Sequence, residues 1–187
     1  MKNERIIKLT MSGLLIAIGI IIPIFSPIKI LIPPASYTLA SHVAIFIAMF
    51  ISPAVAVSVA VGTTFGFLMG GFPIEIVLRA ATHVIFAFLG ALYLHRMINE
   101  KPSPFGLRIF SFVIAIIHAA AEVIVISFFY FGGNLSTAFV ERGYFMSVIM
   151  LVGFGTIVHS MIDFEIAYII SRPLKKQRTL AEYFVKC

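Results

Sequence analysis

Six long apolar segments place the tightest constraint on what this chain can fold into. They are continuous runs rather than alternating ones, so they indicate helices and argue against a β-barrel. Most of them approach the roughly 20 residues that a helix needs to cross a bilayer. Ser52 and Pro53 divide two of the runs, because serine suits the residue before a helix and proline suits its first turn. We therefore predict an all-α polytopic membrane bundle of six transmembrane helices, at about residues 5–25, 38–51, 53–71, 73–95, 107–130 and 144–170.

Composition and charge favour a single membrane domain over residues 1–187. Charged residues make up only 12% of the chain, against roughly a quarter in soluble domains. Eleven of the fourteen lysines and arginines lie before residue 10, between residues 96 and 108, or after residue 171. Six helices would place these regions on one side, which the positive-inside rule assigns to the cytoplasm. We expect both termini to be cytoplasmic, and the net charge of +6 to reflect membrane orientation rather than nucleic-acid binding.

The helix predicted at 73–95 carries three ionisable residues on one face. Glu75, Arg79 and His83 are spaced i, i+4 and i+8, so a helix stacks them along one stripe. Ionisable groups inside a membrane face a partner, a cavity or a ligand. Glu75 and Arg79 either neutralise each other within the helix, or Arg79 receives a carboxylate or phosphate in its planar, two-pronged guanidinium. Both interpretations stay open at this point.

Polar residues elsewhere extend this candidate site. His118 and Glu122 are one turn apart in the fifth helix, and His42 lies near the start of the second. Lys29 belongs to a proline-rich segment at 26–37, which we interpret as a lid or as an interfacial connector. Asn134 lies in the loop after the fifth helix, on the same predicted outer side. The predicted substrate-binding set is Arg79, His83, Glu75, His42, His118, Glu122, Lys29 and Asn134.

The sequence contains none of the common catalytic or nucleotide-binding motifs: it has no HExxH, P-loop, nucleophile elbow or dinucleotide fingerprint. The histidines of four helices, with Glu122 and Asp163, can be drawn as a metal centre, but their expected depths differ. We expect Asp163 and Glu165 nearer the cytoplasm, where they would meet Arg172, Lys175 or a cytoplasmic partner. We therefore predict no metal, no cofactor and no enzyme activity. An intramembrane metalloenzyme and a scaffolding protein remain the alternatives.

Small residues mark two helix faces for close approach. Gly13 and Ala17 in the first helix indicate either packing within the chain or docking to another protein. Gly62, Gly66 and Gly70 give a continuous face on the third helix. We expect this second face to contact a neighbouring helix, with a ligand as the less favoured alternative.

Taken together, these features resemble the substrate-binding S components of energy-coupling factor (ECF) vitamin transporters. The likeness rests on six helices in 187 residues, the Gly13–Ala17 pair, the long first outer loop and the run YTLASHVAIFIAMFISPAVAVSVAVGTTFGF at 37–67. The family's first helix commonly shows AxxxA, whereas Gly13 takes the first small position here. The segment SYTLASHVAIFIAMFISP at 36–53 is most similar to the pantothenate and niacin branches.

The resemblance implies a function and a set of partners. An S component binds a vitamin from outside, under a lid formed by the first loop, in a bacterial cell membrane. It then associates with a membrane coupling protein (EcfT-like) and two ATPase subunits, here through Gly13 and Ala17. Pantothenate and niacin both carry a carboxylate, which agrees with Arg79 as its receptor. We prefer pantothenate, with niacin or another vitamin as the alternative substrate.

Overall fold

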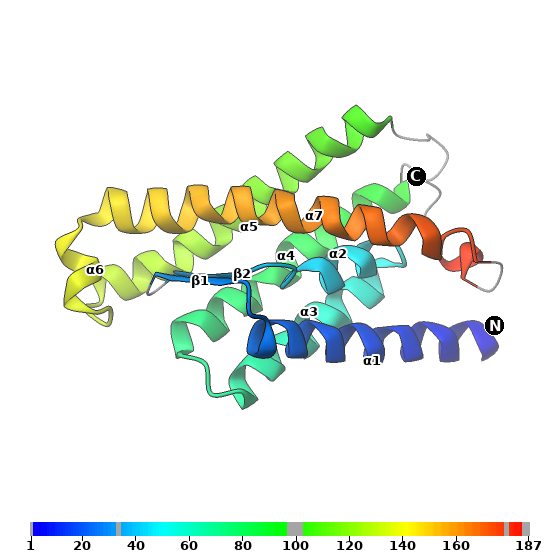
Figure 1. Cartoon of the computed structure of the whole chain (residues 1–187), viewed down its shortest axis with the longest axis horizontal. Helices are drawn as coiled ribbons and strands as arrows, with labels where there is room; N and C mark the ends of the chain where they lie inside the picture. Colours follow the sequence, from blue (N-terminus) through cyan, green and yellow to red (C-terminus); the bar gives the residue numbers. More distant parts are fainter. Residues whose placement is uncertain (1, 33–34, 97–102, 178–179, 185–187) are drawn as a thin grey trace.

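The computed structural model describes residues 2–32, 35–96, 103–177 and 180–184, and it is built mainly from long helices laid side by side (Figure 1). The first helix and the last long helical stretch run along the long axis of the molecule in Figure 1, and the stretches Ile74–Arg96 and Pro104–Phe131 cross it obliquely. The elements in chain order are α1 (Lys2–Phe25), β1 (Lys29–Ile32), β2 (Ala35–Thr38), α2 (Val43–Met49), α3 (Pro53–Met69), α4 (Ile74–Arg96), α5 (Pro104–Phe131), α6 (Thr137–Glu141), the π-helix η1 (Phe145–Phe154), α7 (Gly155–Leu174) and the 3-10 helix η2 (Ala181–Tyr183).

Four helical stretches of the described chain are long and apolar enough to span a membrane. They are Glu4–Phe25, Ile74–Arg96, Pro104–Phe131 and Phe145–Leu174. Helix α3 is a shorter apolar helix, and α2 has only seven residues, all of them buried. All six predicted segments contain a helix near its predicted place, and the all-α class holds apart from one hairpin. A full crossing by six helices stays a prediction, because α2 lies inside the bundle and is too short to span it.

The boundary between α2 and α3 follows from the sequence signal at residue 52. The Ser52 hydroxyl accepts the backbone N–H of Val55 at 3.1 Å, and Pro53 begins α3. Helix α2 contributes Phe46, buried at 1% exposure, to the main hydrophobic core. This burial draws the chain just before α2 toward the centre of the bundle.

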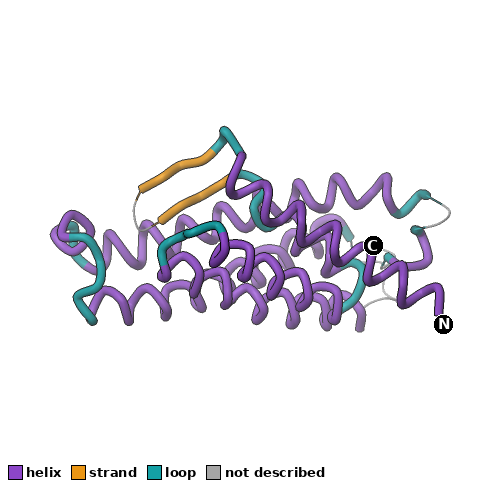
Figure 2. Tube along the Cα trace, turned by 90° about the horizontal axis from the view of Figure 1, so that it is seen from below, coloured by secondary structure: helices purple, strands orange, loops and turns teal. Residues whose placement is uncertain are grey.

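The proline-rich segment contains an antiparallel β-hairpin, which the sequence analysis did not predict. Its register pairs Lys29 with Thr38 and Ile30 with Tyr37. Figure 2 shows the two strands standing out at one side of the helical body, while Figure 1 places them between α1 and α7. The hairpin points toward the end of the molecule that holds α6.

The start of α1 and the end of α7 lie at the opposite end of the molecule (Figure 1). This arrangement agrees with the prediction that the basic N-terminal and C-terminal regions share one side. The assignment of that side to the cytoplasm stays a prediction.

The glycine face of α3 contacts α1, as the favoured interpretation predicted. A Cβ built on Gly62 would lie 2.6 Å from the Ile16 side chain, and one on Gly66 would collide with Ile20. Gly13 and Ala17 lie instead on an exposed face of α1, and a Cβ on Gly13 would meet nothing within 4 Å. Packing of Gly13 and Ala17 within the chain is therefore wrong, whereas docking to another protein stays a prediction.

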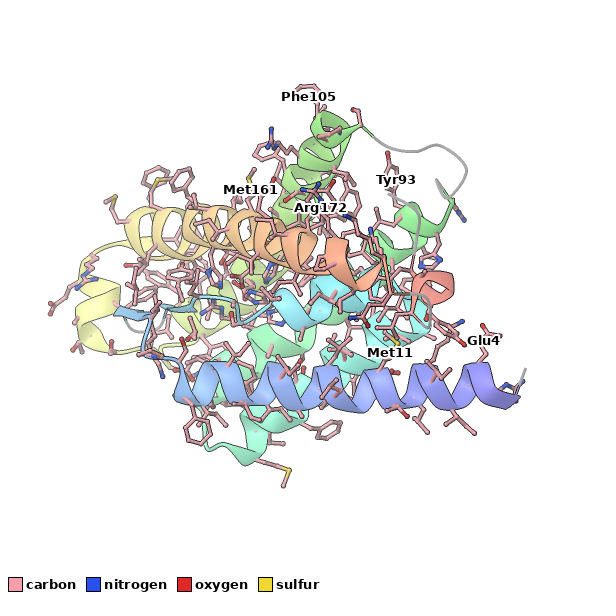
Figure 3. The ribbon with its side chains drawn as sticks, turned by 45° about the vertical axis from the view of Figure 1, so that its right-hand side comes forward. Glu4, Met11, Tyr93, Phe105, Met161 and Arg172 are labelled. Carbon is pink, nitrogen blue, oxygen red and sulfur yellow. The ribbon has the colours of Figure 1, made fainter. Side chains whose placement is uncertain are left out.

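The two faces of α1 yield a matched pair of variants. Figure 3 shows Met11 pointing from α1 toward the bundle, while other side chains of α1 point away from it. We expect Gly66→Leu to lower the free energy of unfolding by about 1–3 kcal/mol, because overpacking a close contact forces the helices apart. Gly13→Leu should leave it unchanged. Thermal unfolding followed by circular dichroism in detergent checks both, and equal destabilisation by the two would contradict the assigned faces.

Candidate functional site

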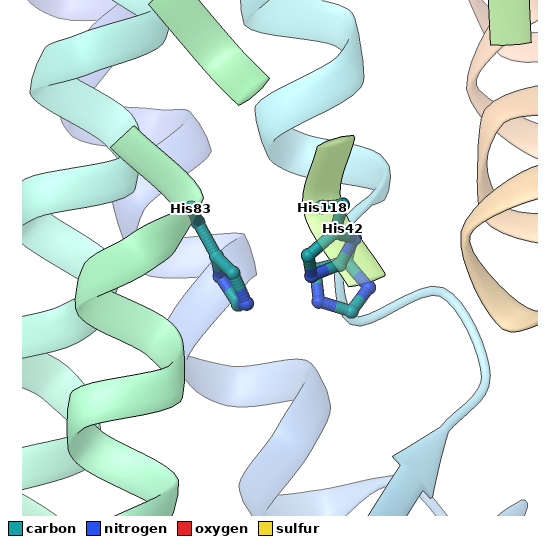
Figure 4. A group of neighbouring side chains, drawn as sticks. All are labelled: His42, His83 and His118. Atoms are coloured by element: carbon teal, nitrogen blue, oxygen red, sulfur yellow. The ribbon is translucent and has the colours of Figure 1, made fainter. Parts of the chain in front are cut away.

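Four histidines from distant parts of the chain meet near the centre of the bundle. His42 comes from the turn before α2, His83 from α4, His118 from α5 and His159 from α7. The His42 ring centroid lies 4.7 Å from that of His83, 4.8 Å from that of His118 and 5.0 Å from that of His159. Figure 4 shows the His83 ring directed toward the rings of His42 and His118. The expected difference in depth is wrong, because burial of α2 brings His42 into the bundle.

Arg79 and Glu122 form a buried ion pair beside these rings. Arg79 Nη2 donates to Glu122 Oε2 at 2.8 Å, and both side chains are less than a tenth exposed. Thr156 Oγ1 donates to the same carboxylate oxygen at 2.6 Å. The other oxygen, Oε1, lies 3.4 Å from the Nε2 atoms of both His83 and His118. Glu122 therefore links α4, α5 and α7 through one carboxylate.

The pairing of Arg79 with Glu75 within one helix is wrong. The partner of Arg79 comes from α5, 43 positions along the chain. Glu75 is half-buried in the first turn of α4, where the helix dipole favours a carboxylate without any cationic partner.

Asp163 holds the turn that presents His42. Its Oδ1 accepts the backbone N–H of Ala40 at 2.8 Å, and its Oδ2 accepts that of His42 at 2.9 Å. The same Oδ2 lies 3.1 Å from His42 Nδ1. Ala40 has a φ of 69°, a left-handed conformation that costs of order 1–3 kcal/mol for a residue other than glycine. The carboxylate stabilises this strained turn and orients the ring that follows it.

The expectation that the acids of α7 meet Arg172 or Lys175 is therefore wrong, whereas contact of Glu165 with a cytoplasmic partner stays a prediction. Asp163 meets the turn before α2 rather than Arg172 or Lys175. Glu165 pairs with Arg108 at 3.3 Å on a largely exposed surface, where an ion pair contributes little to stability.

A cavity of about 40 Å³ lies between the ion pair and the histidines. Its polar wall includes Arg79, Glu122, His83, His42 and His159, and its apolar wall includes Phe67, Phe72 and Ile76. The rings of Phe67 and Phe72 lie 4.7 Å apart. The cavity combines a buried cation with aromatic surface, which suits a small aromatic anion.

Several predicted binding residues lie outside this cavity. Lys29 Nζ donates to the backbone carbonyl of Pro23 at 3.2 Å, and Asn134 is exposed in the turn after α5. Glu75 is not part of the cavity wall. His118 lies just behind the wall, against Glu122. The structure therefore brings Arg79, His83, His42, His118 and Glu122 together and leaves Glu75, Lys29 and Asn134 apart from them. Their roles in substrate binding stay predictions.

The sequence analysis missed Tyr37 as part of this region. Its hydroxyl donates to the backbone carbonyl of Leu151, and its ring lies 5.5 Å from that of His159. Burial raises the pKa of the Tyr37 hydroxyl to about 12, so the phenol stays a hydrogen-bond donor at physiological pH. Gly155 makes room for it, since a Cβ there would collide with the hydroxyl. The signal available was a tyrosine at the start of the YTLASHV run, four residues before Ser41.

Comparison with known proteins identifies a relative along nearly the whole chain. The chain is similar to the Niacin transporter NiaX of Lactococcus lactis subsp. cremoris (strain MG1363), with 37% identity over 176 residues. The matched region covers 94% of this chain and 78% of the relative. The chain belongs to the NiaX family. No protein-family model matches it, and no solved structure does.

Membership of the NiaX family confirms the resemblance to ECF S components, whose niacin branch was one of the two named. The protein is a multi-pass protein of the bacterial cell membrane, in agreement with its long apolar helices. The preference for pantothenate finds no support in this relative. The niacin alternative agrees with the relative's name.

Proposed function

We propose that the protein is the vitamin-binding subunit of an ECF-type importer and that its substrate is niacin. The observation that carries the proposal is the buried guanidinium of Arg79 at a small, partly aromatic cavity, in a chain 37% identical to a niacin transporter. Niacin at neutral pH is a pyridine ring bearing a carboxylate. Arg79 would bind the carboxylate through paired hydrogen bonds, and Phe67 and Phe72 would pack on the ring.

The Arg79–Glu122 pair explains how the buried charge of Arg79 is compensated while the cavity is empty. A buried charge without a partner is costly, so Glu122 compensates Arg79 until a ligand carboxylate arrives. His83, on the cavity wall, would hydrogen-bond the ring nitrogen of niacin through the imidazole nitrogen that does not face Glu122. Niacin also suits the site better than pantothenate, because a flat ring matches the aromatic wall and a long flexible chain does not.

Transport would take its energy from other subunits. The protein is not expected to be an enzyme, and we propose that a membrane coupling protein and two ATPases complete the importer. Gly13 and Ala17 lie on the exposed face of α1, where a partner helix can approach closely. This face is the proposed docking site for the coupling protein.

Ligand binding to the purified protein tests the substrate. We expect isothermal titration in detergent to show about one nicotinate bound per protein. Nicotinamide should bind at least about 10-fold more weakly, because it lacks the charge that pairs with Arg79. Pantothenate serves as the competitor of similar charge. Tighter binding of pantothenate than of nicotinate, or no binding of nicotinate, would overturn the niacin assignment.

A further inference from the structure

The three histidines of Figure 4 are arranged like the ligands of a metal ion. His42, His83 and His118 each offer one ring nitrogen, and these three atoms all lie within 4.8 Å of one another. All three residues are buried, at 8%, 5% and 1% exposure. A tetrahedral ion with bonds of about 2.0–2.1 Å needs nitrogen atoms about 3.3 Å apart. Small rotations of these rings, which come from separate segments, reach that spacing.

Hydrogen bonds occupy one nitrogen of the His42 and His118 rings and leave the other nitrogen of each ring available. His42 Nδ1 is engaged by Asp163 at 3.1 Å, and His118 Nδ1 lies 3.3 Å from Ser160 Oγ. His118 Nε2 is buried and finds no hydrogen-bond partner among the described residues. Ligating histidines characteristically hold one ring nitrogen on a carboxylate or hydroxyl and present the other to the metal. Asp163 and Ser160 occupy those outer positions here.

Glu122 lies beside two of these rings and could join the three histidines as a fourth ligand. Its Oε2 is taken by Arg79 and Thr156, whereas Oε1 lies 3.4 Å from the Nε2 atoms of His83 and His118. This distance is close to the ligand–ligand distance of about 3.3 Å expected for tetrahedral coordination of a zinc ion. Three imidazoles and one carboxylate favour zinc, cobalt or nickel over magnesium or calcium.

A second group of potential ligands shares His42 but fits a metal less well. His42, His159 and Asp163 also lie within the same spacing. However, Asp163 already accepts the N–H groups of Ala40 and His42, and His159 Nε2 lies 3.1 Å from Ser41 Oγ. Because these hydrogen bonds hold the turn before α2, we infer that Asp163 and His159 position His42 rather than bind a metal.

The charges around the cavity provide an independent argument. Arg79 contributes one positive charge, and Glu122 and Asp163 contribute two negative charges, so the site with neutral histidines carries a net charge of −1. Binding of a nicotinate carboxylate would change the net charge of the site from −1 to −2. Such an excess of negative charge is costly in a buried environment. One divalent cation restores neutrality and draws Glu122 toward the metal, which frees Arg79 for the vitamin.

We propose that His42, His83, His118 and Glu122 bind one divalent transition-metal ion of the zinc, cobalt and nickel class directly beneath the vitamin cavity. The ligand geometry carries the metal site, and the charge argument for it also rests on the proposed function. Its support of vitamin binding also rests on the proposed function.

Cobalt and zinc titrations of the full-length protein test the site. The protein is purified in detergent with a tag that contains no histidine, treated with a chelator, and titrated with Co²⁺ alone. We expect about one equivalent to bind, with the intense visible absorption of tetrahedral cobalt, and Zn²⁺ to displace it. Failure of the wild-type protein to bind cobalt, or an octahedral spectrum, would overturn the proposal.

Single histidine variants locate the ion. His118→Gln and His83→Gln should weaken cobalt binding by about 100-fold or more, since each removes a ligand. His95→Gln is the matched control, because His95 lies on α4 with His83 but outside the cluster. Glu122→Gln should keep all three imidazoles and shift the cobalt spectrum, which a variant that merely loosened the fold would not do. Circular dichroism confirms folding, and equal cobalt affinity in His118→Gln and His95→Gln would overturn the assignment.

Nicotinate titration with and without zinc separates this inference from the proposed function. We expect nicotinate to bind at least about 10-fold more tightly to the zinc-loaded protein. Nicotinate binding that is unchanged by chelation, in a protein that binds no cobalt, overturns the metal site and leaves the vitamin assignment standing. Cobalt binding at the cluster without any nicotinate binding supports the metal site and overturns the niacin assignment.

Discussion

Replacing Arg79 by glutamine is expected to weaken nicotinate binding by about 100-fold or more. The substitution removes the one cationic side chain on the wall of the described cavity. Truncating one partner of a buried, hydrogen-bonded charge pair costs about 2–5 kcal/mol of binding free energy. It should also abolish the preference for nicotinate over nicotinamide, because only nicotinate carries the charge that Arg79 recognises. Titration of both ligands measures the two effects.

Two further variants separate binding from folding in this test. Arg79→Gln leaves Glu122 buried without its cation, which costs about 3–5 kcal/mol of stability. The double variant Arg79→Gln with Glu122→Gln removes that unpaired charge. It should therefore recover stability but not nicotinate binding. Arg108→Gln is the control arginine, since its side chain is 67% exposed and pairs with Glu165 at the surface. Nicotinate binding that survives Arg79→Gln would remove Arg79 from its assigned role.

Replacing Asp163 by alanine is expected to cause a large loss of stability, about 3 kcal/mol or more. The carboxylate is fully buried and is bonded to two backbone N–H groups and to the His42 ring. Its removal leaves buried donors without partners, each at a cost of about 1–3 kcal/mol, and releases the left-handed turn at Ala40. Chemical unfolding followed by circular dichroism measures the loss.

Glu165→Ala is the matched control for Asp163→Ala. Glu165 lies two residues further along the same helix, but its side chain is 42% exposed and its ion pair is at the surface. We expect its removal to leave the unfolding midpoint nearly unchanged. Equal losses from the two variants would show that Asp163 does not hold the turn.

Local signals allowed most of the helices to be predicted. Apolar runs located α1, α4 and α5, and the Ser52–Pro53 pair located the start of α3, because caps and first-turn prolines act within a few residues. The glycine face of α3 predicted a close neighbour correctly. The hairpin was missed because its strands lie in a short proline-rich segment without clear alternation.

The partners of the buried charges could not be predicted in the same way. Glu122 is 43 positions from Arg79, and Asp163 is 121 positions from His42. Such contacts depend on how far each helix penetrates the bundle, and the short, wholly buried α2 was not apparent from hydropathy. Helical spacing instead suggested the local pair of Glu75 with Arg79, which tertiary packing overrides. The cluster of histidines was visible as residues but not as a site.

The size of the cavity has a consequence for the speed of uptake. A volume of about 40 Å³ has room for only a few water molecules, each of which needs about 10–15 Å³. A nicotinate ion therefore does not fit until the surrounding segments part. The association rate would then level off at high vitamin concentration, at the frequency with which the protein opens. Departure of the vitamin would wait for the same opening. A ligand captured in this way would stay enclosed long enough for a slow encounter with the proposed coupling protein to complete delivery.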